Sequence, residues 1–405
     1  MNHEKKYLGY NVLEAARGRI SWVFDTFPKI CVSFSGGKDS TVVLHLVAEE
    51  ARKRNRKIYV LFVDWEAQYK ITIDHVLNMF SRYNDIIIPY WVALPLKTVN
   101  ATSQIEPEWI AWDRDKKSLW VRNPPEIAIT NFDTFPFYTY AMTFEEFVPS
   151  FEKWISSDGS ATAMFVGIRT GESLNRWRTI FSESKGTYEG NPYTTRVGDL
   201  VCRVFPIYDW SDSDIWVFHN KTALPHNNLY DLMYQAGLPL KNMRICEPYG
   251  SEQRQGLWLY HIIEPESWGK LVARVSGANM GALYAKTRGN ILGINQIELP
   301  TGHTWKSFAL SLLDSMPVPT SEHYKNKIAI YLKWYLTRGY PEGIPDQQDG
   351  DCGSTDLKPS WKRICKVLLR NDYWCHGLSF SPTKTSAYNK YLQLMKKRRE
   401  EWNLI

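Results

Sequence analysis

Residues 29–44 read KICVSFSGGKDSTVVL, and this stretch decides the fold of the 405-residue chain. A short apolar run over 29–34 ends in a Ser-Gly-Gly turn, and from Asp39 to Arg54 the apolar residues recur at helical spacing. The stretch therefore predicts a buried strand, a tight loop and a helix in direct succession. Two adjacent glycines, Gly36 and Gly37, let such a loop turn sharply and approach a ligand.

The loop from Ser35 to Ser40 has the chemistry of a phosphate-binding site. Free N–H groups and the dipole at a helix start attract an anion. Lys38 adds a cation, the two serines add hydroxyl donors, and Asp39 could hold Mg²⁺ against the phosphates. The loop is not a Walker A motif, because position 32 is Val and Asp39 follows the lysine. The alternative is a plain glycine turn with a capping residue, but strand, loop and helix each stand where phosphate binding needs them.

Four further apolar runs and an amphipathic stretch at residues 11–24 surround this unit. The runs lie at 57–63, 86–94, 163–168 and 201–207. Short apolar strands separated by helices are typical of a doubly wound, mostly parallel sheet that is covered on both faces. We therefore expect the α/β class, with ligands bound at the carboxyl ends of the strands.

The pattern becomes mainly helical after about residue 240, with helices expected at 305–316, 321–338, 360–375 and 384–402. We predict an α/β domain over 1–240 and a helical domain over 241–405. Residues 97–150 form a Trp- and Pro-rich insertion, which is too long for a plain connection and is expected to cap the site.

Composition indicates a cytoplasmic protein. The net charge of +6 is compatible with a polyanionic partner but does not establish one. The six cysteines are scattered without a C-x-x-C pair, which favours reduced thiols. The N-terminus is polar and no apolar run reaches 18 residues, so neither export nor membrane insertion is expected.

Two more segments follow predicted strands. Asp64 follows the second strand, where it could contact a nucleotide or metal or could cap a helix. Gly167–Arg176 reads GIRTGESLNR. There Arg169 offers a planar fork for phosphate or sulfate, Glu172 could orient it, and Arg176 adds a cation. The alternative for this segment is a surface helix with ion pairs.

The SGGKDS string resembles the pyrophosphatase loop (PP-loop) of the N-type ATP pyrophosphatases, which include the phosphoadenosine-phosphosulfate (PAPS) reductases. Gly167–Arg176 resembles the G-x-R-x-x-E-S-x-x-R element of PAPS reductases. The resemblance implies an adenine nucleotide such as ATP with Mg²⁺, and cleavage between the α and β phosphates. It implies catalytic roles for Lys38, Asp39, Arg169 and Glu172. The implied nucleotide-binding residues are Ser33, Ser35, Gly36, Gly37, Lys38, Asp39, Ser40, Asp64, Gly167, Arg169 and Arg176.

Two more strings carry the same resemblance: PIYDWSDSDIW at residues 206–216 and NLYDLMY at residues 228–234, the second like an N-x-L-Y element. Trp210 and Trp216 are expected in the core rather than stacked on a ligand. The family pattern breaks at the cysteines. We find no C-terminal Cys-Gly segment of the kind that carries the reductase nucleophile, and only Cys246 follows the N-x-L-Y element. One thiolate can be a nucleophile but cannot hold an iron–sulfur cluster alone, so we expect no cluster.

Beyond residue 240 the chain resembles the IbrA/YbdN-like branch with the DUF3440 region, in strings such as RICEPYGSEQRQGLWLYHIIE at 244–264. That resemblance implies a ParB/sulfiredoxin-like partner protein. Cations and aromatic residues are mixed from Trp361 onward, and the segment ends in Lys396–Arg399, which suggests DNA or RNA binding or a solvated helix end. Three hypotheses follow: adenylylation of a substrate, a nucleotide-gated regulator without turnover, and, least favoured, a PAPS reductase-type enzyme.

Overall fold

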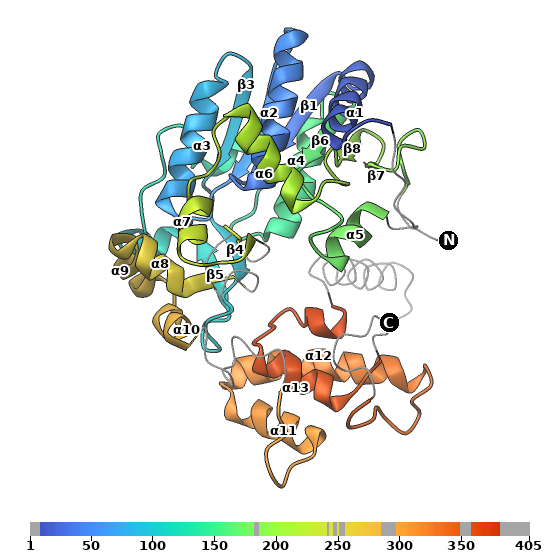
Figure 1. The fold of residues 1–405 in the computed structure, drawn as a ribbon. Coiled ribbons are helices and arrows are strands. Elements are labelled where there is room, and N and C mark those ends of the chain that lie inside the picture. Colours follow the sequence, from blue (N-terminus) through green and yellow to red (C-terminus); the bar gives the residue numbers. More distant parts are fainter. Residues whose placement is uncertain are drawn as a thin grey trace, which may run out of the picture. The chain divides into compact units, whose positions relative to one another are not determined.

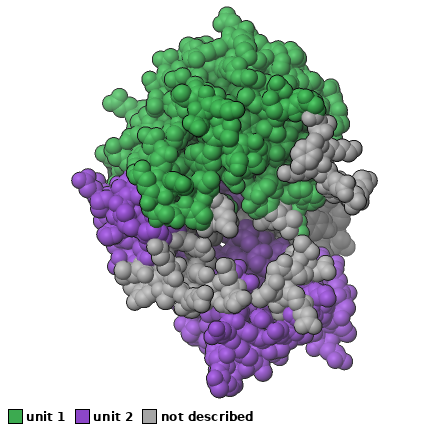
Figure 2. Space-filling model, viewed as in Figure 1, with its two compact units in different colours: residues 1–96, 111–142, 147–246 green, residues 97–110, 143–146, 247–405 purple. Residues whose placement is uncertain are grey.

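The computed structural model describes residues 9–181, 186–240, 243–245, 249–250, 256–284, 297–348 and 358–380. The chain divides into two compact units (Figure 2). The first unit comprises residues 1–96, 111–142 and 147–246, and the second comprises 97–110, 143–146 and 247–405. The insertion after residue 96 is thus shared between the units.

A six-stranded sheet forms the centre of the first unit, with the strand order β3-β2-β1-β6-β8-β7 (Figure 1). All neighbouring pairs are parallel except β7 with β8. The predicted doubly wound, mostly parallel sheet is confirmed, and each predicted strand run contains a strand. The strands are β1 (Lys29–Ser33), β2 (Ile58–Val63), β3 (Ile87–Val92), β6 (Thr162–Val166), β7 (Thr194–Val197) and β8 (Val201–Val204). The edge strand β7 was not predicted, because its sequence TTRV contains a single apolar residue.

Helices cover both faces of this sheet. On one face, α1 (Val12–Thr26), α2 (Lys38–Lys53), α3 (Lys70–Arg82) and α6 (Asp212–Thr222) share a core with alternate strand residues such as Ile30 and Val32. On the other face, α4 (Phe144–Ile155) packs Phe151 against Tyr90 of β3, with ring centroids 5.3 Å apart. Its buried Glu152 accepts two hydrogen bonds from Arg203 of β8. Burial on both faces explains why the strands read as continuous apolar runs.

The strand order reverses at β1, which lies between β2 and β6. The chain proceeds from β1 to β2 and β3 in one direction, and β6 and β8 lie in the other. The register pairs Ser33, the last residue of β1, with Val166, the last residue of β6. The loops that follow these two strands therefore meet at the point where open α/β sheets bind their ligands.

The first unit also contains short helical elements. They include the 3-10 helix η1 (Arg114–Leu119) in the insertion, α5 (Leu174–Phe181) after the β6 loop, and α7 (Leu229–Gln235) after α6. A second 3-10 helix, η2 (Phe132–Thr134), leads into Phe135, whose ring contacts Phe147 and Phe151 of α4.

The second unit is mainly helical, as predicted, but it also contains a two-stranded sheet of β4 (Leu96–Val99) and β5 (Glu108–Ala111) that was not predicted. Its helices are α8 (Leu257–Ile263), α9 (Pro265–Arg274), α10 (Ala278–Tyr284), α11 (Trp305–Ser315), α12 (Val318–Leu336), α13 (Trp361–Leu369) and the 3-10 helix η5 (His376–Leu378). The helix α13 ends earlier than predicted, because Asn371 adopts a left-handed conformation with φ 50°. The predicted helix at 384–402 lies outside the described residues. No helix in the described ranges is long and apolar enough to cross a membrane.

Candidate functional site

The loop between β1 and α2 requires its glycines for steric reasons. Gly36 has φ 74°, and a Cβ there would come within 3.0 Å of the Thr72 and Val76 side chains of α3. Gly37 is the N-cap of α2 and has no side chain to occupy the helix start. The sequence expectation of a tight, closely packed loop is confirmed.

Hydrogen bonds from two directions hold this loop in place. The Ser40 hydroxyl donates to the Gly37 carbonyl at 3.0 Å and lies 3.0 Å from the Ser35 hydroxyl. From the segment before α7, the Asn227 side-chain amide donates to the Gly36 carbonyl at 3.1 Å. The Lys38 backbone N–H donates to the Tyr230 hydroxyl, also at 3.1 Å. Asn227 and Tyr230, the polar residues of the N-x-L-Y element, therefore hold the loop by its backbone, a role that the sequence did not reveal.

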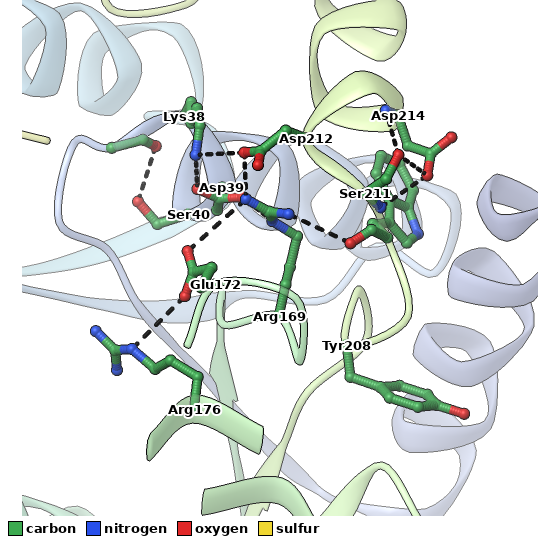
Figure 3. Close-up of polar contacts among 12 residues, drawn as sticks. Lys38, Asp39, Ser40, Arg169, Glu172, Arg176, Tyr208, Ser211, Asp212 and Asp214 are labelled. Carbon is green, nitrogen blue, oxygen red and sulfur yellow. Dashed lines mark hydrogen bonds and ion pairs between the residues drawn. The ribbon is translucent and has the colours of Figure 1, made fainter. Parts of the chain in front are cut away.

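A compact cluster of opposite charges lies at the start of α2 (Figure 3). Lys38 Nζ is 2.7 Å from Asp39 Oδ2 and 3.5 Å from Asp212 Oδ1. Arg169 Nε is 2.5 Å from Asp39 Oδ1, and its Nη2 is 2.7 Å from Asp212 Oδ1. The predicted residues Lys38, Asp39 and Arg169 thus come together, and Asp212 at the start of α6 joins them without having been predicted.

Arg169 acts as a bridge inside this cluster. Its side chain is only 2% exposed, so the alternative of a surface ion-pair helix is wrong for this residue. Besides the two carboxylates, its Nη1 donates to the Trp210 carbonyl at 3.3 Å. Burial lowers the pKa of the guanidinium, but Asp39, Asp212 and Glu172 outweigh burial and raise it. Arg169 therefore holds the carboxylates of Asp39 and Asp212 in place.

Glu172 and Arg176 extend the cluster toward solvent. Glu172 lies 3.9 Å from Arg169 Nη2, and Arg176 Nε lies 3.6 Å from the other Glu172 oxygen (Figure 3). Burial raises the pKa of Glu172, and the nearby charge of Asp39 raises it further. The Arg176 side chain is half-exposed, so it is the cation of this group that solvent reaches most easily.

Gly167 brings the β6 loop against the β1 loop. A Cβ at this position would lie 2.9 Å from the Ser40 Cα and backbone nitrogen, and 3.0 Å from the Asp39 carbonyl carbon. The two loops therefore touch backbone to backbone at the switch point of the sheet. The predicted Ser33 ends β1 in the same region and is half-buried.

Asp64 follows β2 at the same sheet edge, but its side chain is fully buried. Its Oδ2 accepts from the Trp91 indole at 2.8 Å, and its Oδ1 accepts from the Glu66 backbone at 2.9 Å and is paired with Arg122. The helix-cap alternative is wrong, because the N-cap of α3 is Tyr69. Each carboxylate oxygen of Asp64 therefore has a partner within the protein.

The insertion supplies two features that the sequence analysis missed. Buried Glu66, with φ 60°, accepts from the backbone N–H groups of Trp112 at 2.7 Å and Val121 at 3.2 Å. Arg122 places its guanidinium 5.1 Å from the Trp112 ring, and its Nε and Nη1 are buried without a partner in the described part of the chain. The insertion thus adds a partly unsatisfied cation beside the end of β2.

The other predicted residues lie away from this cluster or outside the described residues. Trp210 is buried in the core, as predicted, and donates to the Val12 carbonyl at 3.0 Å, whereas Trp216 is only partly buried. In the second unit, Lys362 packs over the Trp305 ring at 5.4 Å, and Arg363 Nε donates to the Gly377 carbonyl. The possible nucleophile Cys246 and the basic run at 396–399 lie outside the described residues.

Two family models cover most of the chain. Residues 29–236 match the phosphoadenosine phosphosulfate reductase domain, and residues 237–344 match the domain of unknown function DUF3440. Because the first model covers more than half of the chain, the chain belongs to the PAPS reductase family, and the predicted PP-loop superfamily and DUF3440 branch are confirmed.

The relatives agree with this assignment. The chain is 51% identical over 401 residues to "Uncharacterized protein YbdN" of Escherichia coli (strain K12), covering 98% of this chain and 97% of that protein. It is 22% identical to the adenosine 5'-phosphosulfate reductase of Shouchella clausii (strain KSM-K16), across 59% of this chain and 81% of the reductase.

Solved structures show weaker likenesses. The PAPS reductase of Candida auris in its phosphate complex has a TM-score of 0.31 and 14% identity, covering 56% of this chain and 94% of that one. The FMN adenylyltransferase of Candida glabrata with FAD and pyrophosphate has a TM-score of 0.33 and 16% identity, covering 56% of this chain and 64% of that one. At these TM-scores the likenesses add nothing to the family assignment.

Proposed function

We propose that the protein binds ATP, or a closely related adenine nucleotide, at the Ser35–Ser40 loop and cleaves it between the α and β phosphates to adenylylate an acceptor. The observation that carries this proposal is the charge cluster at the switch point of the sheet, in which the largely buried Lys38, Asp39 and Arg169 meet the partly exposed Asp212. A helix start with an adjacent lysine at such a point is suited to bind phosphates.

The charge balance of the cluster supports a metal-bound nucleotide. Two cations, Lys38 and Arg169, are already paired with two carboxylates, Asp39 and Asp212. A triphosphate alone would therefore meet as much negative as positive charge. Asp39 and Asp212 fit Mg²⁺, which typically binds one or two carboxylates together with phosphate oxygens. When bound, Mg²⁺ would neutralise charge on the leaving pyrophosphate.

The proposed reaction forms one bond and breaks one. A nucleophilic oxygen of the acceptor attacks the α-phosphorus, the bond from that phosphorus to the α–β bridging oxygen breaks, and the electron pair leaves with pyrophosphate. Lys38 leaves Asp39 and binds the departing phosphates together with the loop N–H groups. Arg169 keeps Asp39 and Asp212 in position throughout.

For the acceptor we propose a nucleic acid or a partner protein. A nucleic acid is supported by the mixture of cations and aromatic residues from Trp361 onward. A partner of the ParB/sulfiredoxin type is suggested by the resemblance of the C-terminal region to the IbrA/YbdN-like branch. The reaction would take place in the cytoplasm.

Pyrophosphate release from ATP and Mg²⁺, measured with and without each acceptor, tests the proposal. We expect Lys38→Ala and Asp39→Ala to slow release by about 100-fold or more, the effect usual for removing a group that stabilises the transition state. Lys53→Ala is the matched control, because Lys53 lies on the same helix and is exposed. Release by both loop variants at the wild-type rate would refute the proposal.

The direct contact between Lys38 and Asp39 favours one second candidate, a nucleotide-gated regulator without turnover. A nucleotide that separates this pair would change the loop without being cleaved. The same assay distinguishes the two: the nucleotide would remain intact while the affinity for DNA or the partner protein changed. Sulfite release from PAPS with a thiol donor, lost in Cys246→Ser, would instead indicate a reductase.

A further inference from the structure

Several hydrogen-bond donors of the loop between β1 and α2 already have acceptors inside the protein. The Ser35 backbone N–H donates to the Ser40 hydroxyl at 3.3 Å, and the Gly37 N–H donates to the Ser35 hydroxyl at 3.4 Å. The Lys38 N–H donates to the Tyr230 hydroxyl at 3.1 Å. A phosphate group that uses these donors must therefore replace the internal acceptors.

The acceptors differ in how easily they can leave. The hydroxyls of Ser35 and Ser40 belong to the loop itself and can turn about a single bond. The Tyr230 hydroxyl belongs to α7, 192 residues further along the chain than Lys38. Tyr230 is 4% exposed, and its ring packs edge-on against the ring of Trp216, with centroids 5.6 Å apart. Because the hydroxyl lies on the ring axis, a ring flip does not move it, and α7 has to move with the ring.

The donor that Tyr230 occupies lies where a phosphate is expected to bind. Gly37 is the N-cap of α2, so Lys38 is the first residue of the helix. The first N–H groups of a helix have no partner within the helix, and they attract anions. A charged phosphate oxygen is also a stronger acceptor than a neutral hydroxyl. The exchange of Tyr230 for a phosphate at the Lys38 N–H is therefore favourable for this hydrogen bond.

Two side chains close over this helix start. A Cβ on Gly37 would lie 3.4 Å from the Tyr230 hydroxyl oxygen and 3.7 Å from Ile245 Cδ1. Gly37 and Lys38 are both buried. A phosphate group is larger than a methyl group, so a phosphate that approaches the Lys38 N–H from this side needs Tyr230 and Ile245 to move.

We propose that Tyr230 is an internal competitor for the nucleotide. A phosphate of the nucleotide replaces the Tyr230 hydroxyl on the Lys38 N–H, and α7 is displaced together with the ring. This inference rests on the proposed function, because it concerns how the same site is filled.

The chain on either side of α7 determines what the displacement affects. Before α7, the Asn227 amide donates to the Gly36 carbonyl at 3.1 Å and to the Thr72 hydroxyl at 3.0 Å, which fixes this end. After α7, which ends at Gln235, the DUF3440 region begins at residue 237. A shift of α7 is therefore passed to the DUF3440 region through the chain itself, and the nucleotide regulates that region.

Isothermal titration calorimetry on the full chain tests the competition. The probes are inorganic pyrophosphate and, with Mg²⁺, an ATP analogue whose methylene bridge between the α and β phosphates resists the proposed cleavage. Tyr230→Phe keeps the ring but leaves the Lys38 N–H without this acceptor in the free protein. We expect the variant to bind both probes about fivefold more tightly, the effect of one neutral hydrogen bond.

Tyr83→Phe is the matched control. Tyr83 is also 4% exposed, and its hydroxyl lies 2.6 Å from Nδ1 of His45, a residue of α2 outside the loop. This variant should bind both probes as wild type does.

Hydrogen exchange gives a second readout. The ATP analogue should speed the exchange of the α7 amides in wild type, although bound ligands usually slow exchange, and it should slow the exchange in the first turn of α2. In Tyr230→Phe the α7 amides should exchange faster even without the analogue.

The outcomes separate this inference from the proposed function. Equal or weaker binding by folded Tyr230→Phe protein, or α7 amides that the analogue does not speed, overturns the inference even if wild type releases pyrophosphate from ATP. Tighter binding by the variant supports the inference even if wild type does not cleave ATP, in which case only the proposed reaction fails. Failure of both probes to bind to either protein overturns both.

Discussion

The loops after β1 and β2 reach the same edge of the sheet, but their carboxylates have different environments. Asp39, after β1, contacts the side chains of Lys38 and Arg169 in a cluster that also includes Asp212. Asp64, after β2, is fully buried and is held by Trp91, the Glu66 backbone and Arg122. Both oxygens of each carboxylate have partners, but the partners differ in kind. Asp39 is held by two cationic side chains beside the start of α2, whereas Asp64 is held by a buried indole, a backbone N–H and a guanidinium of the insertion. The comparison shows that the same residue type at one sheet edge can hold a charge cluster together or attach the insertion to the end of β2.

The largest expected effect tests Asp64 as an anchor. We expect Asp64→Ala to lower the free energy of unfolding by about 3–5 kcal/mol, because it leaves the Arg122 charge and the Trp91 indole buried without this acceptor. Urea denaturation measures the change. Asp74→Ala, an exposed change on α3, should cost about 0.5 kcal/mol or less. A stable Asp64→Ala protein that no longer binds nucleotide would move Asp64 into the site and break the comparison.

The next effect concerns the contact between the β1 and β6 loops. Gly167→Ala should cost about 1–3 kcal/mol, because its Cβ would collide with the Ser40 backbone. It should also displace Asp39 and weaken nucleotide binding. Gly171→Ala is the control, since no atom lies within 4 Å of a Cβ there. Equal nucleotide affinities in the two variants, measured by calorimetry, would show that loop contact does not position the site.

Acid should lower the stability of the region around α2, the helix that follows β1. Burial lowers the pKa of His45 and His219 to about 4 and that of His75 to about 3, and all three lie on or against α2. Because the unfolded chain takes up these protons near pH 6.5, stability is full above that pH and falls as the pH drops toward 4. The slope reaches about 1.4 kcal/mol per pH unit for each histidine.

Thermal denaturation between pH 7 and 4.5 measures this loss, and His219→Gln should flatten the curve. Hydrogen exchange should show the α2 amides losing protection at a higher pH than the amides around Asp64. An equal loss of amide protection in α2 and around Asp64 would contradict this prediction.

The smallest expected effect tests whether the raised pKa of Glu172 lowers the stability of the protein at neutral pH. Its folded pKa is raised by burial and by Asp39, so its own contribution to stability is lost as the pH rises above about 4.5 through that pKa, and this loss opposes the gain from the three histidines. Glu172→Gln should remove the loss and change stability by less than about 1 kcal/mol. Melting temperatures at pH 4.5 and 8 measure the difference, and the variant should gain more between these two pH values than wild type does. An equal gain in the two proteins would assign the effect to another group.

Local patterns were enough to predict the parts of the fold whose signal is continuous along the chain. The runs at 29–34 and 57–63 contain buried parallel strands because their apolar residues need cover on both faces. The edge strand β7 (TTRV) and the β4–β5 sheet (LKTV and EWIA) could not be predicted, because these short segments mix polar and apolar residues and depend on their neighbours for pairing. Asp212 could not be predicted as a member of the cluster either, because it lies there only through the packing of α6 beside α2.

The sequence by itself determined the strand–loop–helix unit, because Gly36 and Gly37 act through local backbone geometry. Only the tertiary structure decided which distant groups pair with the carboxylates at this edge of the sheet. It placed Arg169 between Asp39 and Asp212, and it gave Asp64 to Arg122 of the insertion. It also left the buried Nδ1 of His219 without a hydrogen-bond partner in the described part of the chain. Burial and pairing across many residues set these partners, and no local pattern encodes them.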